Sequence, residues 1–196
     1  MANALVITSN PAADSLTDAI GAAFATGAES AGATARVIDL YESGFNPVYS
    51  LADREHYQGH GDMPVDVLPY QKALADADAI AFVTPIYWYT MTAMMKGFFD
   101  RVICRGFAYD GATGAPLALS GKKVRFIMLT GGSEEWYRIS GIGDALDAQI
   151  AQNTFAKYCG ITDMQMLYVD RTSDDDAAHR AEQLAMATQW GRDAAL

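Results

Sequence analysis

Short runs of apolar residues alternate along this chain with longer stretches in which apolar residues recur every three or four positions. The short runs cover 4–8, 34–40, 79–84, 123–130 and 164–169. Runs of this length, bounded by polar or glycine-rich residues, predict strands of a parallel sheet, and 4–8 and 79–84 should be buried.

The longer stretches have the spacing of amphipathic helices, with charged residues on the outer face. They cover 16–29, 67–77, 91–102, 143–158 and 174–190. A loop-rich insertion at 41–69 adds a short helix capped by Ser50, and an insertion of this length usually covers a site or forms an interface. Strands and helices in alternation predict one doubly wound α/β domain over residues 1–196, with a five-stranded parallel sheet and helices on both faces.

The loop after the third strand carries the most distinctive residues. Pro85 cannot donate a hydrogen bond to a neighbouring strand, so the strand should end there, and helical spacing begins at Met91. Between them stand three aromatic residues, Tyr87, Trp88 and Tyr89. Open α/β sheets bind planar ligands at the carboxyl ends of their strands, so we expect these rings to line a ligand. The alternative is that they belong to the core or to an interface.

Two further loops follow strand ends. The loop after the first strand is rich in hydroxyl and amide groups, and at a helix start such groups form an anion site. The alternative is plain capping by Ser15 with Asp18. After the fourth strand, the pair Gly131-Gly132 allows backbone N–H groups to converge on an anionic edge, although an ordinary turn would also explain it.

The strand order decides whether these loops meet. No G-x-G-x-x-G follows the first strand, which favours the flavodoxin-like order 2-1-3-4-5 over a dinucleotide-binding fold. In that order, the loops after the first, third and fourth strands converge on one crevice at the carboxyl edge of the sheet. A hydroxyl-rich loop, an aromatic loop and a glycine pair in one crevice together describe a flavin site.

Composition excludes several classes of partner. The chain has 196 residues, 51% of them hydrophobic and 19% charged, and a net charge of −10. Nucleic acids and anionic membrane surfaces are unlikely partners, because binding either requires clustered Lys and Arg. The uncharged stretch 79–95 is too short to span a bilayer and is interrupted by Pro85, so we expect no membrane insertion.

No metal centre or redox disulfide is expected. Cys104 and Cys159 have neither metal-site nor CxxC spacing, and the three histidines are dispersed, so we predict buried structural thiols. The chain runs directly into its first strand without a basic segment before it. We therefore expect no signal peptide and a cytoplasmic location.

Three segments resemble the NAD(P)H:quinone reductases of the flavodoxin-like fold, in particular the bacterial group known as NAD(P)H dehydrogenase (quinone). The most specific segment is TPIYWYTMTAMMKGFFDRV at 84–102, followed by GFAYD; a proline, an aromatic pair, Lys-Gly and Asp-Arg-Val recur there in this order. The other two are DLYESGFNPVYSLADREHY at 39–57 and TGGSEEWY at 130–137. The resemblance extends along nearly the whole chain.

The resemblance implies a flavin held by three loops. The phosphate and ribityl chain would be bound by Asn10, Ser15, Leu16 and Thr17. The isoalloxazine ring would be lined by Pro85, Ile86, Tyr87, Trp88 and Tyr89. Its pyrimidine edge would be approached by Thr130, Gly131 and Gly132, with Tyr137 nearby.

Two positions depart from the family pattern. Asn10 stands where the first loop commonly begins with His. Segment 140–144 lacks the His that the mammalian-type reductases place beside the flavin. A Tyr–His proton relay would therefore lack its second member, and Tyr137 is the candidate catalytic residue.

The functional hypothesis is an oxidoreductase that takes hydride from NADH or NADPH onto a flavin and delivers two electrons to a quinone or similar aromatic acceptor. We expect FMN, with FAD as the alternative, because the chain ends soon after the helix that follows the fifth strand. We also expect a homodimer, whose partner chain would cover the exposed rings and the insertion 41–69. Two alternatives remain: a flavodoxin-like single-electron carrier, and a regulatory flavoprotein that docks on a membrane transporter or a transcription partner.

Overall fold

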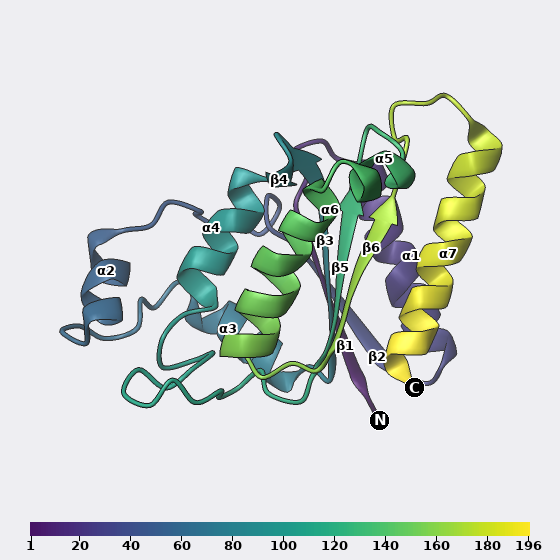
Figure 1. Ribbon diagram of the computed structural model, residues 1–196. Coiled ribbons are helices and arrows are strands. Elements are labelled where there is room, and N and C mark those ends of the chain that lie inside the picture. Colours follow the sequence, from purple (N-terminus) through teal and green to yellow (C-terminus); the bar gives the residue numbers. More distant parts are fainter.

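A parallel sheet runs through the centre of the molecule, with its strands in the order β2-β1-β3-β5-β6 (Figure 1). The computed structural model describes residues 1–196. The parallel strands are β1 (Asn3–Thr8), β2 (Thr34–Asp39), β3 (Ala79–Tyr87), β5 (Lys123–Leu129) and β6 (Asp163–Val169). Numbered among themselves, these strands have the order 2-1-3-4-5, so the predicted flavodoxin-like topology is confirmed.

Helices cover both faces of the sheet (Figure 1). On one face lie α1 (Leu16–Ser30) and α7 (Ala177–Ala195). The other face carries α3 (Leu68–Asp76), α4 (Ala93–Val102), α6 (Ile142–Leu146) and η1 (Asp147–Tyr158). Because strand side chains alternate, Val83 packs into the core under α1 and α7, whereas Phe82 packs into the core on the opposite face.

The helices α1 and α7 approach each other closely through glycines. A β-carbon on Gly27 would lie 1.9 Å from the carbonyl oxygen of Thr188, and one on Gly191 would lie 1.9 Å from that of Phe24. Any side chain at either position would clash with backbone, so the two helices can pack at this distance only with glycine at the contact.

The strand β3 does not end at Pro85, contrary to the sequence prediction. It pairs with β5 as far as Pro85 and Leu129, and then folds back through Tyr87 into the short antiparallel strand β4 (Thr90–Met91). The carbonyl of Val83 points toward β1. An N–H group on the residue two positions later would point the same way, and Pro85 has none. The pairing of β3 with β1 ends at Val83, before Pro85 is reached, so Pro85 interrupts no paired part of that ladder.

The helix after the hairpin starts later than its spacing indicated. Met91 belongs to β4, and α4 begins at Ala93, with Thr92 as its N-cap accepting a hydrogen bond from the N–H of Met95 at 3.2 Å. The predicted helix 143–158 is present as α6 and η1. Hydrogen bonding in η1 is π-helical, so the N–H of Cys159 donates to the carbonyl of Thr154. A further short helix, α5 (Glu134–Ile139), was not predicted.

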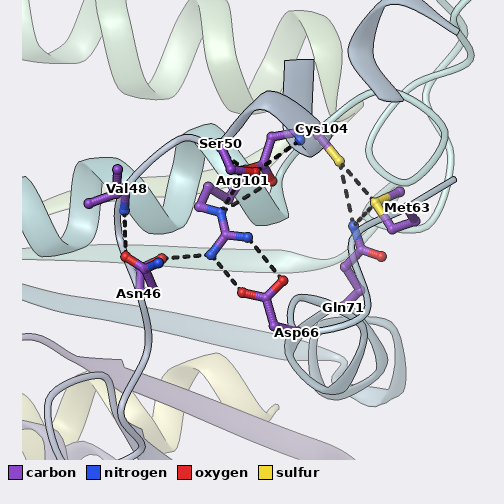
Figure 2. A network of polar contacts seen from close by, with 9 residues as sticks. Asn46, Val48, Ser50, Met63, Asp66, Gln71, Arg101 and Cys104 are labelled. Carbon is purple, nitrogen blue, oxygen red and sulfur yellow. Dashed lines mark hydrogen bonds and ion pairs between the residues drawn. The ribbon is translucent and has the colours of Figure 1, made fainter. Parts of the chain in front are cut away.

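The insertion between β2 and α3 is fastened to α4 by one buried arginine (Figure 2). Arg101 donates through Nε to both carboxylate oxygens of Asp53 at 3.1 and 3.0 Å, and through its two terminal nitrogens to Asp66 at 2.8 and 3.0 Å. It also donates to the carbonyl of Asn46 at 2.7 Å. We call this set of contacts the Arg101 latch.

Asp53 belongs to the predicted short helix of the insertion. This helix, α2 (Leu51–Gln58), is capped by Ser50 as expected, and the Ser50 hydroxyl and N–H both donate to Asp53. Burial acts to raise the pKa of Asp53, but the hydrogen bonds from Ser50 and Arg101 outweigh it, and the pKa lies below its usual value. None of the helices has the length and apolar character needed to cross a bilayer.

Candidate functional site

The loops after β1, β3 and β5 meet at the carboxyl edge of the sheet, as predicted. They enclose a cleft of about 390 Å³, which the loop after β6 closes on a further side. The cleft is lined by Asn10, Leu16, Thr17, Pro85, Ile86, Tyr87, Leu129, Gly131, Thr172 and Ser173.

The first loop caps its helix and also leaves backbone N–H groups without partners. Ser15 caps α1 through a capping box with Asp18, so its side chain is engaged within the protein. The side chain of Asn10 donates to the hydroxyl of Thr17 at 3.0 Å, which fixes the loop against the helix start. The backbone N–H groups of Leu16 and Thr17 have no hydrogen-bond partner. They stand at the positive end of the helix dipole, which is the arrangement that binds a phosphate.

A cluster of buried hydroxyls holds the strand ends beneath the cleft. Ser9, after β1, donates to Thr84 of β3 at 2.9 Å, and its oxygen lies 3.1 Å from that of Thr92 at the start of α4. Thr84 and Thr92 are 3.3 Å apart. These contacts join β1, β3 and α4 at one point, so the wall formed by Pro85, Ile86 and Tyr87 has a fixed position.

Of the glycine pair, Gly131 lines the cleft. Neither Gly131 nor Gly132 has a positive φ, and a β-carbon on Gly131 would meet nothing nearer than the Ser173 hydroxyl at 3.6 Å. The fold itself therefore does not require glycine at position 131, and an added side chain would extend into the cleft. The N–H groups of both glycines lack partners, so they are available to a ligand.

Thr130 lies behind the glycine pair and does not line the cleft. It is fully buried, its hydroxyl donates to the carbonyl of Gly132 at 2.9 Å, and its own carbonyl accepts from the N–H of Thr172 at 3.0 Å. Its role in this structure is to shape the loop. The same carbonyl accepts from the Thr172 hydroxyl at 3.2 Å, so the loops after β5 and β6 are tied together.

Trp88 and Tyr89 form the turn of the β3–β4 hairpin and do not line the cleft. Tyr87 and Thr90 pair on either side of them, so the turn has two residues. Both have positive φ, +48° and +66°, which is the type I′ geometry that usually takes Asn or Gly. Trp88 is 92% exposed. Two bulky residues in this conformation are strained, and such strain concentrates at functional sites.

Tyr137 lies beside the glycine pair on α5. It is 5% exposed, and an atom of its ring lies 3.8 Å from the position that a β-carbon on Gly132 would take. Burial, and then the nearby Tyr89, raise the pKa of Tyr137. Its hydroxyl is therefore protonated at neutral pH and can donate a hydrogen bond.

Sequence reasoning missed the loop after β6, which supplies Thr172 and Ser173 to the cleft. The N–H of Arg171 donates to the carbonyl of Gly132 at 3.2 Å, and Asp170 accepts from the N–H of Glu134 at 3.0 Å. The signal was available in the sequence, since Arg-Thr-Ser follows the carboxyl end of a strand in the same way as the other three loops.

A second, larger pocket lies between the insertion, β4, α4 and η1. It has a volume of about 570 Å³, and its lining includes Tyr49, Tyr57, Tyr109 and Gln149. The Arg101 latch forms part of its floor through Asp53 and Arg101.

The two cysteines are unpaired, and no group of His, Cys, Asp or Glu has the arrangement of a metal site. Cys159 is buried and Cys104 is half-buried. Burial raises the pKa of Cys104 to about 11 and that of Cys159 to about 12, so both remain protonated thiols at neutral pH. Both lie just beyond helix ends instead of within helices.

The residues of the cleft suit the phosphate, the ring and the polar edge of a flavin. Free N–H groups at the start of α1 suit a phosphate, the β3 wall suits a flat ring, and the open space and free N–H groups at Gly131 and Gly132 suit the polar edge of that ring. The separate features recognised in the sequence therefore converge on one site.

Comparison with known proteins agrees with this arrangement. A family described as having the flavodoxin-like fold matches residues 2–191. An uncharacterized NAD(P)H oxidoreductase of Haemophilus influenzae is 32% identical over 155 residues, which cover 77% of this chain and 76% of that protein. The ancillary protein of the glutathione-regulated potassium-efflux system of Klebsiella pneumoniae is 38% identical over 109 residues, which cover 55% of this chain and 59% of that protein.

A solved structure shows the same fold. The NAD(P)H:quinone oxidoreductase of Methanothermobacter marburgensis superposes with a TM-score of 0.89 at 25% identity, covering 98% of this chain and 96% of that one. The resemblance drawn from the three sequence motifs is thereby confirmed. This chain belongs to the flavodoxin-like fold family, among the NAD(P)H oxidoreductases and quinone reductases of that fold.

Proposed function

We propose that this protein is an FMN-dependent NAD(P)H:quinone oxidoreductase that transfers two electrons to a quinone or similar aromatic acceptor. One observation carries the proposal: the cleft combines N–H groups without hydrogen-bond partners, at the start of α1 and at Gly131, with the wall formed by Pro85, Ile86 and Tyr87. The names of the Haemophilus and Methanothermobacter relatives support the choice of reaction.

Different residues would bind different parts of the cofactor. Asn10, Leu16 and Thr17 would hold the phosphate and ribityl chain, and Pro85, Ile86 and Tyr87 would lie along the ring. When bound, the flavin supplies the acceptance of hydride from NADH or NADPH and the delivery of two electrons. The loop after β6 adds the hydroxyls of Thr172 and Ser173 to this set.

The protein's own contribution would be position and electrostatics. The N–H groups of Gly131 and Gly132 would stabilise negative charge that develops at the pyrimidine edge, where they are already oriented. The neutral Tyr137 hydroxyl would donate either to that edge or to the acceptor oxygen. The exposed Trp88 and Tyr89 rings would stack in turn on the nicotinamide and on the acceptor, so that both substrates use one site.

FMN instead of FAD, and assembly as a homodimer, are parts of the same proposal. The choice of FMN is supported by a cleft that offers one anion site, at the start of α1, beside one wall for a flat ring. A second copy would cover the pocket between the insertion and η1, which is lined by Tyr49, Tyr57 and Tyr109 and is open to solvent. A cytoplasmic location remains a prediction from the sequence.

The test is to purify the protein, record its visible spectrum, and identify any released cofactor by mass. NADH or NADPH should bleach the flavin absorbance, and a quinone should restore it. Release of FAD would overturn the choice of FMN. A protein that takes up neither flavin would overturn the proposal as a whole. Light scattering at micromolar concentration tests the dimer, because a fully active monomer would refute a composite site.

A glycine variant tests the site itself. Gly131→Val places a branched side chain in the cleft without straining the backbone, because φ at this position is not positive. Gly131→Val should therefore lose flavin binding and keep the melting temperature of the apoprotein. Gly131→Ala, with one added carbon, is the graded control and should retain more flavin than the valine variant. Equal flavin affinity in all three proteins would place the ligand elsewhere.

The relation to the Klebsiella ancillary protein supports a second candidate, regulation of a membrane transporter. A stable complex with the soluble part of a transporter, together with negligible turnover of NAD(P)H, would favour this role. A single-electron carrier is distinguished by dithionite titration, in which the one-electron-reduced flavin would accumulate without any reductase activity.

A further inference from the structure

A second buried tyrosine packs against Tyr137. Tyr168, next to the last residue of β6, is 8% exposed. Its ring centroid lies 5.9 Å from that of Tyr137, at an interplanar angle of 52°. Tyr137 also meets the ring of Trp136 edge to face, at 5.2 Å and 83°. The Tyr137 ring is therefore held by aromatic contacts from both the sheet and its own helix.

Tyr168 is itself fixed by the helix that carries Tyr137. The guanidinium carbon of Arg138 lies 5.7 Å from the centroid of the Tyr168 ring, within cation–π range. Arg138 is oriented in turn by Glu134, to which its Nε donates at 3.0 Å. Tyr168 of β6 thus contacts two residues of α5, Tyr137 and Arg138.

The hydroxyl of Tyr168 closes the corner between α5 and α6. It lies 3.1 Å from the position that a β-carbon on Gly143 would take, and the carbonyl oxygen of Tyr137 lies at the same distance. This corner belongs to segment 140–144, where the mammalian-type reductases carry a His that this chain lacks. Here the corner is occupied from the sheet side, by a tyrosine on β6.

We propose that Tyr168 is a positioning residue for Tyr137, holding its ring beside Gly132 so that its hydroxyl can reach a ligand in the cleft. The inference rests on the proposed function, in which Tyr137 donates a hydrogen bond to the flavin edge or to the acceptor. No hydrogen bond joins the Tyr137 and Tyr168 hydroxyls, so Tyr168 acts through the packing of its ring and is not a second member of a proton relay.

The first test measures the rates of the two half-reactions separately: reduction of the flavin by NADH or NADPH, and its reoxidation by a quinone. Tyr168→Leu removes the ring and should slow the half-reaction that uses Tyr137 by about tenfold, because small misplacements of a reacting group cost rate steeply. Tyr168→Phe keeps the ring and should react at the wild-type rate. In a Tyr137→Phe background, Tyr168→Leu should cause no further loss. Equal losses in both backgrounds would show that Tyr168 acts independently of Tyr137 and would overturn the proposal.

A second readout does not depend on activity. The apoprotein is labelled with 3-fluorotyrosine, and the Tyr137 signal in its ¹⁹F NMR spectrum is assigned by its loss in Tyr137→Phe. This signal should move toward the unfolded-chain position in Tyr168→Leu and stay in place in Tyr168→Phe.

The two readouts separate failure of this inference from failure of the proposed function. An unchanged Tyr137 signal in Tyr168→Leu overturns the inference even if the wild type is an active reductase. A shifted signal in a protein that neither binds flavin nor oxidises NAD(P)H supports the packing and refutes the proposed function instead. A shifted signal with unchanged rates in an active enzyme overturns the positioning role.

Discussion

Replacing Trp88 should make the protein more stable and less active. Trp88 has φ +48° in a type I′ turn and is 92% exposed, so its ring contributes little to folding while its backbone is strained. A left-handed conformation costs roughly 1–2 kcal/mol for most L-residues, and Asn tolerates it better than any other non-glycine residue. Trp88→Asn should therefore stabilise the fold by about 1 kcal/mol, which for a chain of this size raises the melting temperature by about 2–4 °C.

The matched control is Trp88→Ala, which removes the same ring and keeps the strained conformation. Its melting temperature should stay close to that of the wild type. The difference in stability between the Asn and Ala variants therefore measures the cost of the left-handed backbone conformation at position 88. Tyr89→Gly should change stability little, because relief of strain at φ +66° is offset by the lost contact with Trp136, whose ring lies 5.9 Å away. Differential scanning calorimetry measures the stabilities, and steady-state quinone reduction measures activity. Asn and Ala variants that melt together would refute the reasoning.

Three further predictions concern the rest of the fold. Arg101→Lys keeps the positive charge of the latch, but a lysine cannot donate to Asp53 and Asp66 with the geometry of the guanidinium. It should lower the free energy of unfolding, measured in urea, by about 2–4 kcal/mol. Asp66→Asn is its control, because the Asp66 side chain is 52% exposed and the cost should stay below about 1 kcal/mol. The pKa of Asp53 is lowered in the folded state, so the ionised Asp53 contributes to the free energy of unfolding fully above about pH 4, and this contribution is lost as pH falls toward the folded-state pKa. Asp53→Asn should therefore flatten the dependence of stability on pH in this range. An unchanged slope would contradict this. Finally, a thiol reagent at pH 8 should modify neither Cys104 nor Cys159 until the protein unfolds. Burial raises the pKa of the two thiols to about 11 and about 12, so few of them are thiolates at that pH. Rapid labelling of the native protein would refute this prediction.

The sheet and its ligand-binding edge could be predicted because their signals are local. A buried parallel strand has to be apolar at nearly every position, and 79–83 shows this without reference to any other segment. The convergence of loops then follows from strand order alone. The same rule applies to Thr172 and Ser173, which follow the fifth parallel strand, so this omission lay in the reasoning and not in the sequence.

Other features depend on partners that the sequence does not identify. Pro85 continues its strand because β1 ends opposite Val83, which only the register between strands reveals. The Trp88–Tyr89 turn lacks the Gly or Asn that signals a left-handed conformation, and its geometry follows from the pairing of Tyr87 with Thr90. Trp88 and Tyr89, grouped with the ring-binding residues by sequence, therefore stand at the hairpin tip and not in the cleft.

The Arg101 latch has a consequence for the order in which the chain folds. The arginine joins Asp53 and Asp66, which lie 48 and 35 residues before it in the sequence. Closing loops of that length costs conformational entropy that is recovered only once α4 has formed and presents the guanidinium. The insertion is therefore the last part of the domain to acquire its structure and the first to lose it. In native-state hydrogen exchange, the amides of α2 should exchange through a local opening of the insertion that requires less free energy than global unfolding. The amides of β1 and β3 should exchange only through global unfolding.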